Sequence, residues 1–285
     1  MTARPLNPVK LCAGNANCNA AAVPRPEAQV GQLSLRQAED SARPDYFYFV
    51  PQDLDPALPP LVSVHGISRN AEEHARAFAP VAAAQRRLLI APHFDAARFD
   101  GFQRLARDTE AAVEALWDDV EAFTGVAQGP VDMVGFSGGA QFTHRYAMLN
   151  PERIRSQVLI AAGWYTLPSE RDSYPYGVKR DSRRGRRAAD NLMRFLALPT
   201  LVLVGACDDQ RDAALRRSPD IDIKQGINRI ERASRWTCSF LQAATRAGGA
   251  ASVQFTMLPD CGHAFEDCVA SGGLVEQVAH WLRRG

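Results

Sequence analysis

A serine, an aspartate and a histidine each follow a separate apolar run of the chain, and these three residue types together can carry out nucleophilic catalysis. Ser137 follows "VDMVGF", Asp208 follows "TLVLVGA" and His263 follows "SVQFTMLP". A serine hydroxyl becomes a good nucleophile only when a histidine takes its proton, and a carboxylate orients that histidine. The sequence therefore predicts a triad of Ser137, Asp208 and His263, in that chain order.

The serine lies at a bend between two predicted elements. In "VGFSGGAQF" the apolar run ends near Gly135, and a helical pattern starts directly after Ser137 and Gly139. Gly-x-Ser-x-Gly between a strand and a helix is the nucleophile-elbow pattern, in which small residues make room for a strained turn. Such a turn places the hydroxyl at a helix N-terminus, whose amides favour developing negative charge. The alternative is an ordinary glycine-rich turn.

The predicted base and acid lie on loops that follow strands. His263 stands in "LPDCGHAFEDC", immediately after the last predicted strand, and its alternative role is that of an exposed loop residue. Asp208, three residues beyond Gly205, is the predicted acid. Asp209 is the fallback, because a shift of the turn by one residue would exchange the two aspartates. The agreement of all three positions favours catalysis over coincidence.

Acyl transfer at a serine also needs backbone donors for the oxyanion of the tetrahedral intermediate. The residue after the nucleophile supplies one of them, so we expect the Gly138 amide in that role. The second is expected from the loop "SVHGISRN", where Gly66 permits a close approach and the Ile67 amide would donate. We expect His65 to orient this loop and not to act as the general base.

The elements that must position these residues alternate along the chain. Short, continuously apolar runs predict buried strands, and amphipathic segments between them predict helices. This alternation is typical of an α/β fold with a mostly parallel sheet, helices on both faces and ligand sites beyond the carboxyl ends of the strands. We expect an irregular N-terminal arm at 1–40 and one domain at 41–285 with a cap-like insertion at about 164–198. The predicted strands are 46–51, 60–66, 87–92, 131–136, 156–163, 200–206 and 252–259, and the longer predicted helices are 105–123, 228–246 and 274–282.

With these residues in place, the chain from about Tyr46 to Leu282 resembles the α/β-hydrolases. The resemblance depends on "HGISRN", "GFSGGAQF", "VGACDDQRD" and "CGHAF" in that order. "FSGGAQFTHRYAMLNPERI" and "AAGWYTLP" are similar to bacterial esterases grouped with polyhydroxyalkanoate depolymerases and feruloyl esterases. The resemblance implies an α/β-hydrolase fold and hydrolysis through an acyl-enzyme, without a metal or a cofactor.

Three functions are compatible with these residues. The first is a serine esterase that acts on a small-molecule carboxylic ester, and the second is a peptidase or amidase with the same triad, because one fold supports several activities. The third is a non-catalytic binding protein on the same fold. Relatives of that kind usually lack the nucleophile, the base or the acid, and this chain has all three. We therefore expect an active esterase.

Residues of the predicted cap and of the oxyanion loop are candidates for shaping the substrate site. Trp164 and Tyr165 follow a strand end and either line the pocket or pack in the core. Arg69 either binds a carboxylate of the substrate or forms a structural salt bridge. The segment "VKRDSRRGRR" is either a solvated surface or a basic rim that attracts an anionic substrate or partner. Its six cations are Lys179, Arg180, Arg183, Arg184, Arg186 and Arg187.

The composition argues against several other classes of protein. Hydrophobic residues make up 46% of the 285, and the formal net charge is +1, so the chain can bury a core and has no global field that would draw it to nucleic acid or to a membrane. No apolar stretch is long enough for a transmembrane helix, and the N-terminus lacks the pattern of a signal peptide. We expect a cytoplasmic protein whose six cysteines are mostly free thiols, with a Cys207–Cys261 disulfide as the alternative.

Overall fold

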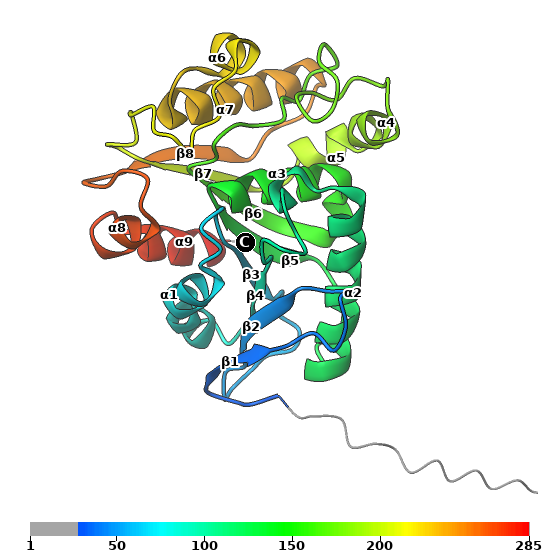
Figure 1. The fold of residues 1–285 in the computed structure, drawn as a ribbon, viewed down its shortest axis with the longest axis vertical. Helices are drawn as coiled ribbons and strands as arrows, with labels where there is room; N and C mark the ends of the chain where they lie inside the picture. The colour runs from blue at the N-terminus through cyan, green and yellow to red at the C-terminus, as the bar shows by residue number, and fades with distance from the viewer. Residues whose placement is uncertain (1–27, 285) are drawn as a thin grey trace, which may run out of the picture.

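A sheet of eight strands runs through residues 28–284, the part of the chain that the structure describes (Figure 1). The structure is a computed structural model. The strand order is β1-β2-β4-β3-β5-β6-β7-β8, and the pairs β1–β2 and β2–β4 are antiparallel whereas the others are parallel. The strands are β1 (Leu33–Arg36), β2 (Asp45–Phe49), β3 (Leu61–Val64), β4 (Leu89–His93), β5 (Val131–Phe136), β6 (Ile154–Ile160), β7 (Thr200–Gly205) and β8 (Val253–Leu258).

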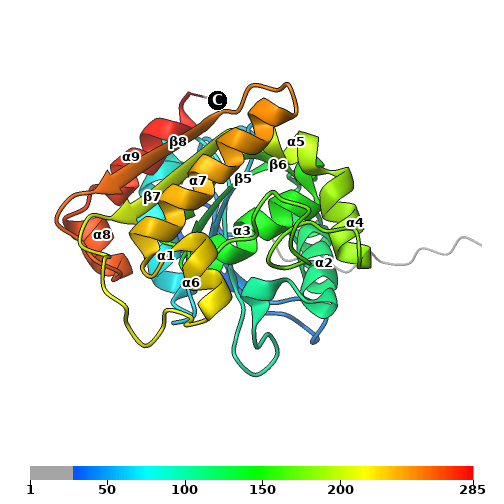
Figure 2. The same cartoon turned by 90° about the horizontal axis from the view of Figure 1, so that it is seen from above.

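Helices cover both faces of this sheet. α1, α8 and α9 lie on one face, and α2, α3 and α7 lie on the other (Figure 2). Within residues 28–284, no helix combines the length and the apolar character needed to cross a bilayer. The helices are α1 (Ala71–Ala84), α2 (Arg107–Thr124), α3 (Gly138–Leu149), α4 (Arg183–Asp190), α5 (Leu192–Leu196), α6 (Pro219–Gln225), α7 (Arg229–Arg246), α8 (Phe265–Ala270) and α9 (Leu274–Leu282), with 3₁₀ turns η1 (Phe102–Arg104) and η2 (Pro151–Arg153).

The central strands are buried because helices pack on both of their faces. Every residue of β3, β5 and β7 is buried, which explains their continuously apolar sequences. The helix α3 that follows β5 is also buried along its whole length, since the sheet lies beneath it and the segment 164–198 packs over it. The core therefore surrounds the strand and the helix that meet at Ser137.

The predicted fold class, an α/β fold with a mostly parallel sheet and helices on both faces, is confirmed. The prediction of an irregular arm over 1–40 is wrong for its last part, because Leu33–Arg36 form the edge strand β1. Four residues are too few to give a clear alternating pattern, and the strand forms because β2 offers a free edge of hydrogen-bonding groups. Residues 1–27 of the predicted arm lie outside the described residues.

The segment predicted as a cap, about 164–198, leaves the carboxyl end of β6 and returns to β7. It runs without regular structure as far as Ser182, whose Oγ accepts a hydrogen bond from Gly185 N (3.0 Å) and so caps α4. α4 and α5 then pack against α3. The segment thus covers the helix that begins at the nucleophile position.

Candidate active site

The backbone at Ser137 is strained in the way that the sequence pattern predicts. Ser137 lies between β5 and α3 with φ 52° and ψ −110°, a conformation that side-chain-bearing residues rarely adopt. A Cβ on Gly135 would lie 2.3 Å from Gly139 O, and a Cβ on Gly139 would lie 2.0 Å from Val64 O. The turn can therefore form only because both flanking positions lack a side chain.

The three side chains of the predicted triad meet at this turn. Ser137 Oγ donates a hydrogen bond to His263 Nε2 across 3.0 Å, and His263 Nδ1 donates to Asp208 Oδ2 across 2.9 Å. The serine is 8% exposed and the aspartate 3% exposed. A proton held on Nδ1 by the carboxylate leaves the Nε2 lone pair directed at the hydroxyl, which is the tautomer that a general base requires. Asp209, the fallback acid, is exposed and accepts a hydrogen bond from Gln210 instead.

A buried arginine holds the aspartate from the other side. Arg229, at the N-terminus of α7 and 1% exposed, donates from Nη1 to Asp208 Oδ1 across 3.1 Å. The same guanidinium binds Asp212 through two hydrogen bonds of 2.7 and 3.2 Å. Hydrogen bonding to Arg229 lowers the pKa of the Asp212 carboxyl to about 2. One oxygen of Asp208 is thus held by His263 and the other by Arg229, so the carboxylate has a single orientation.

The loop that carries the histidine is fixed to the loop that carries the acid. Cys207 N donates to Cys261 O across 2.9 Å, and a Cβ on Gly205 would lie only 2.4 Å from that same oxygen. The Phe136 ring also stacks on the imidazole of His263, with 5.3 Å between centroids and 27° between planes. Backbone contact and ring stacking therefore restrict the imidazole to the plane in which it meets the serine.

The two amides predicted to form an oxyanion hole lie beside the serine. Gly138 is the first residue of α3, and the first N–H groups of a helix have no partner inside it. A Cβ on Gly138 would lie 3.3 Å from Ile67 N. Gly66 comes equally close, since a Cβ there would lie 3.4 Å from Ser137 Cβ. The loop that carries Ile67 therefore packs closely against the start of α3 and against Ser137.

His65 holds the loop that carries Ile67, in agreement with its expected role. Its Nδ1 donates to Gly66 O across 2.7 Å, and its Nε2 accepts from Phe94 N across 3.0 Å. Burial lowers the pKa of His65 to about 4, so the ring is neutral near pH 7. Both ring nitrogens of His65 are hydrogen-bonded to the backbone, so the ring links the loop that carries Ile67 to the loop after β4.

Several solved structures have a fold similar to that of this chain. The chain is similar to poly(aspartic acid) hydrolase-1 from Sphingomonas sp. KT-1, with 23% identity, a TM-score of 0.73 and coverage of 91% of this chain and 99% of that chain. It is also similar to LpqC, the poly(3-hydroxybutyrate) depolymerase from Bordetella parapertussis, with 23% identity, a TM-score of 0.71 and coverage of 87% and 89%. The chain has the α/β-hydrolase fold.

A more distant neighbour is an S-formylglutathione hydrolase from Agrobacterium tumefaciens, with 16% identity, a TM-score of 0.57 and coverage of 88% of this chain and 94% of that chain. No protein-family model matches the sequence, and no curated protein is significantly similar to it. The α/β-hydrolase fold accounts for the meeting of the triad, because β5, β6, β7 and β8 are parallel neighbours whose carboxyl ends lie at one edge.

Arg69 is bound to backbone carbonyls of this α/β-hydrolase fold. Its Nη1 donates to Phe94 O and, across 3.1 Å, to Phe99 O, and its guanidinium lies 4.8 Å from the centroid of the Phe102 ring. It has no ion-pair partner within residues 28–284. The residue therefore fastens the loop after β4 to the oxyanion loop. This contact is structural, although it is made to carbonyls and not through the salt bridge considered from the sequence.

The two aromatic residues after β6 lie in different surroundings. Tyr165 is fully buried and stacks on Trp236 at 5.0 Å, so it packs in the core. Trp164 is 4% exposed, and its ring contacts two guanidinium groups, those of Arg145 at 4.0 Å and Arg216 at 5.3 Å from the ring centroid. Both side chains are therefore buried, Tyr165 against Trp236 and Trp164 against the two arginines.

Most cations of the basic segment are paired with acids. Arg184 and Arg187 both bind Glu110 on α2, so they hold α4 against that helix. Arg183 and Arg186 are exposed and have no acidic partner within the described chain. The other pairs of the segment are Lys179 with Asp181 and Arg180 with Glu170 and Asp190. The segment is mainly an ion-paired surface and does not form a continuous free basic rim.

The predicted alternative of a Cys207–Cys261 disulfide is not found. All four cysteines in the described residues are free thiols, namely Cys207, Cys238, Cys261 and Cys268. Burial raises the pKa of the Cys261 and Cys268 thiols, which disfavours the reactive thiolate at neutral pH. Cys12 and Cys18 lie outside the described residues.

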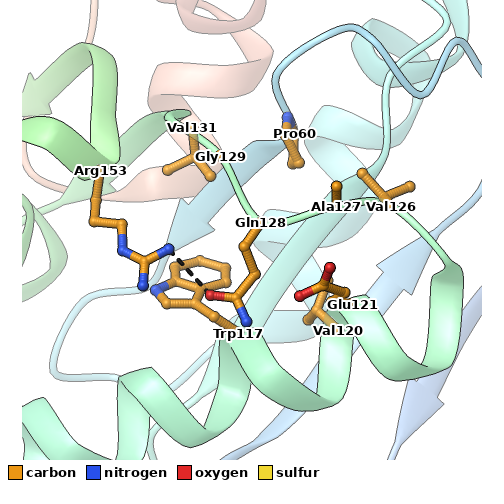
Figure 3. Close-up of a pocket in the computed structure, with 10 residues that line it drawn as sticks. All are labelled: Pro60, Trp117, Val120, Glu121, Val126, Ala127, Gln128, Gly129, Val131 and Arg153. Carbon is orange, nitrogen blue, oxygen red and sulfur yellow. Dashed lines mark hydrogen bonds between the residues drawn. The ribbon is translucent and has the colours of Figure 1, made fainter.

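An apolar pocket under α2 lies at the opposite edge of the sheet (Figure 3). Its lining includes Pro60 and Val131, which stand at the amino ends of β3 and β5, together with Trp117. Its cavity of about 20 Å³ has room for roughly one water molecule. It is too small for an organic substrate and is remote from Ser137, so it is no part of the candidate site.

The sequence does not predict the two residues that hold the acid and the base of the triad, Arg229 and Phe136. Arg229 lies 21 positions after Asp208 and on a different element, and Phe136 reads only as the last apolar residue of a strand. One signal was available, because "GACDDQRD" brings three acids together at a buried edge and so requires a nearby cation. The identity of that cation depends on how α7 packs.

Proposed function

We propose that this protein is a serine hydrolase that cleaves a carboxylic ester through an acyl-enzyme. The observation that carries the proposal is the unbroken chain of hydrogen bonds from Ser137 Oγ through His263 to Asp208. The close packing of Gly66 and Gly138 around Ser137 and Ile67 supports the second part of the proposal, in which the Ile67 and Gly138 amides bind the oxyanion. Esterases, a depolymerase and hydrolases among the structural neighbours support the same class of reaction.

In the first half of the proposed reaction, Ser137 Oγ attacks the ester carbonyl carbon while His263 Nε2 takes the hydroxyl proton. The carbonyl electron pair moves to oxygen, and the Ile67 and Gly138 amides stabilise its negative charge. Asp208 stabilises the imidazolium that has formed. The tetrahedral intermediate then collapses, the bond to the alcohol oxygen breaks, and the imidazolium gives its proton to the leaving alcohol. The acyl group stays on the serine.

In the second half, water takes the place of the alcohol. His263 Nε2 removes a proton from the water, and the oxygen attacks the acyl carbon of the ester formed with Ser137. The second intermediate collapses with cleavage of the bond to Oγ, which recovers its proton from the imidazolium. One ester and one water become one acid and one alcohol. The triad returns to its initial protonation state.

A peptidase or amidase is the second candidate. The same triad serves both reactions, and one structural neighbour is named for the hydrolysis of poly(aspartic acid), whose units are joined by amide bonds. A non-catalytic binding protein is the third. The complete hydrogen-bonded triad argues against it, because a protein without catalytic function has no use for the strained backbone at Ser137.

Labelling with a fluorophosphonate tests the proposal. An activated serine attacks the phosphorus and stays modified, so we expect labelling of the wild type and its loss in Ser137→Ala and His263→Ala. Asp209→Asn is the matched control, since this exposed neighbour of the acid has no contact with the histidine, and it should keep full labelling. Matched esters and amides then separate the first two candidates by their rates. A folded wild type that stays unlabelled would favour the binding protein.

A further inference from the structure

Several buried polar atoms in residues 28–284 have no hydrogen-bond partner, and three of them belong to Arg145 and its neighbours. They are Nη2 of Arg145, the hydroxyl of Tyr174 and Oε1 of Gln103. Buried polar groups are nearly always satisfied in folded proteins, and an unsatisfied one calls for a ligand, an ion or a water. These three atoms can therefore donate to or accept from a bound group.

The three side chains belong to one network. Arg145 Nη1 donates to Gln103 O across 2.5 Å, and its Nε donates to Thr166 Oγ1 across 3.1 Å. The Thr166 hydroxyl donates in turn to Pro175 O across 2.6 Å, and Pro175 is the neighbour of Tyr174. The network therefore joins α3, η1 and the segment 164–198, and Tyr174 lies close enough to Arg145 to act on its charge.

The region is positively charged, because Glu110, the carboxylate that acts on Tyr174, is already bound by Arg184 and Arg187. Arg145 is fully buried, and no carboxylate within residues 28–284 pairs with it. Burial, together with the nearby Arg104 and Arg216 cations, lowers the pKa of Arg145 to about 10, so the guanidinium stays charged at neutral pH. Arg104 and Arg216 also have no acidic partner in the described chain. A buried cation without a counter-ion is unfavourable, so an anion from outside would be stabilised here.

A layer of aromatic rings separates this cation from solvent. The Trp164 ring contacts the guanidinium groups of both Arg145 and Arg216, and Tyr176 stacks on Trp164 at 5.1 Å. Arg216 is exposed, donates to the Tyr176 hydroxyl across 2.7 Å and lies 5.5 Å from the Tyr176 ring centroid. No acid in the described residues pairs with it, and it carries the same charge as the buried arginine.

The network adjoins the candidate active site. α3 begins directly after Ser137, and Arg145 is eight residues farther along it, roughly 12 Å along the helix axis. Gln141, one turn after the serine, lies between them, with Oε1 3.5 Å from Arg145 Nη1. On the other side, a Cβ on Gly138 would lie 3.7 Å from Gln103 Cβ. The serine and the network are thus neighbours along α3, with the side chain of Gln141 between them.

We infer that Arg145, Tyr174 and Gln103 form a subsite for a carboxylate carried by the ester substrate, an inference that rests on the proposed function. Arg145 Nη2 and the Tyr174 hydroxyl donate to the two carboxylate oxygens. The Gln103 amide turns its nitrogen toward the anion, since its oxygen and nitrogen positions are interchangeable. Arg216 swings away from Tyr176 to admit the substrate and then adds its charge. The substrate class is a monoester of a dicarboxylic acid, with a chain of about ten carbons between serine and subsite.

Pairs of 4-nitrophenyl esters of equal chain length, one with a terminal carboxylate and one without, test the inference. The carboxylate members are the monoesters of adipic, suberic and sebacic acid, and the neutral members are the hexanoate, octanoate and decanoate. We expect kcat/KM of the wild type to favour the carboxylate member of each pair, most strongly at the length that reaches Arg145. Tyr174→Phe removes only the unpartnered hydroxyl, so it should raise KM about tenfold for the carboxylate esters and leave the neutral esters unchanged. Arg216→Gln should act in the same direction. Tyr48→Phe, a buried tyrosine on β2, is the control.

Binding of free sebacate, measured by calorimetry, separates the subsite from the catalytic proposal. We expect sebacate to bind the wild type more tightly than decanoate does, and about tenfold less tightly to Tyr174→Phe. A wild type that is labelled by fluorophosphonate and cleaves both esters of each pair alike would overturn the subsite and leave the hydrolase standing. A protein that binds sebacate but is never labelled would keep the subsite and refute the hydrolase. Equal binding of sebacate and decanoate would also overturn the subsite.

Discussion

Asp208 divides its two carboxylate oxygens between two partners, and this division gives Arg229 a function beyond stability. His263 holds one oxygen at 2.9 Å and Arg229 holds the other at 3.1 Å. Arg229 also binds Asp212, so one buried cation neutralises part of the charge of two carboxylates. Without it, Asp208 would be free to rotate and would be repelled by Asp212. We therefore regard Arg229 as a positioning residue for the acid of the triad.

Arg229→Met should lower kcat for a neutral ester about 10- to 100-fold and leave KM nearly unchanged, because a small misplacement of the acid disturbs the transition state more than substrate binding. Arg229→Lys should recover part of the loss, since it keeps the charge. Steady-state kinetics per folded molecule, with folding checked by circular dichroism, give the measurement. Asp212→Asn is the control and should retain activity, because it keeps the Arg229–Asp208 contact. An Arg229→Met protein of unchanged kcat would show that the arginine is only structural.

At the scale of elements, the turn between β5 and α3 depends on how closely the helix approaches the sheet. A Cβ on Gly139 would lie 2.0 Å from the Val64 carbonyl oxygen of β3, so the strand and the helix would have to separate. Gly139→Ala should lower the free energy of unfolding by about 3 kcal/mol and abolish labelling of Ser137. Gly129→Ala is the matched control, because nothing lies within 4 Å of its added Cβ, and it should change stability by less than about 0.5 kcal/mol.

Urea denaturation and fluorophosphonate labelling of both glycine variants give these quantities. A stable Gly139→Ala protein with a reactive serine would contradict the steric argument, since it would mean that α3 shifts without loss of the turn. A Gly129→Ala protein as unstable as Gly139→Ala would show that the measured loss has nothing to do with the approach of helix and strand.

The sequence predicts those parts of the site that local sterics control. Gly135, Ser137 and Gly139 mark the elbow because the tight turn and the close approach of α3 to β3 leave no room for side chains beside the serine, and Asp208 and His263 are found because they follow apolar strands. Residues that reach the site only through the packing of distant elements have no recognisable sequence pattern. Arg229 comes from α7, the Arg145–Tyr174 network joins three elements, and β1 forms only because β2 has a free edge.

At the scale of the whole molecule, folding buries several histidines in their neutral form. His65, His74 and His144 are each at most 1% exposed. Burial lowers the pKa of all three, to about 4 for His65. A histidine in the unfolded chain has a pKa near 6.5. The unfolded chain therefore binds more protons than the folded one as the pH falls below about 6.5, and stability must decrease in that range.

The free energy of unfolding should be constant from pH 8 to about 7 and then fall steadily to pH 5. The loss of stability due to His65 alone reaches at most about 3 kcal/mol, near pH 4, where the folded-state pKa of His65 lies. Asp212, whose pKa is lowered to about 2, loses its contribution only below pH 4, so the two effects occupy different ranges. Urea titrations at each pH give the measurement.

His74→Phe should reduce the slope of the free energy of unfolding against pH, because phenylalanine can stack on Phe265 as His74 does at 3.7 Å and takes no proton. His280→Gln, at an exposed position on α9, should leave the slope unchanged, and a flat profile down to pH 5 would show that the buried histidines do not control acid stability.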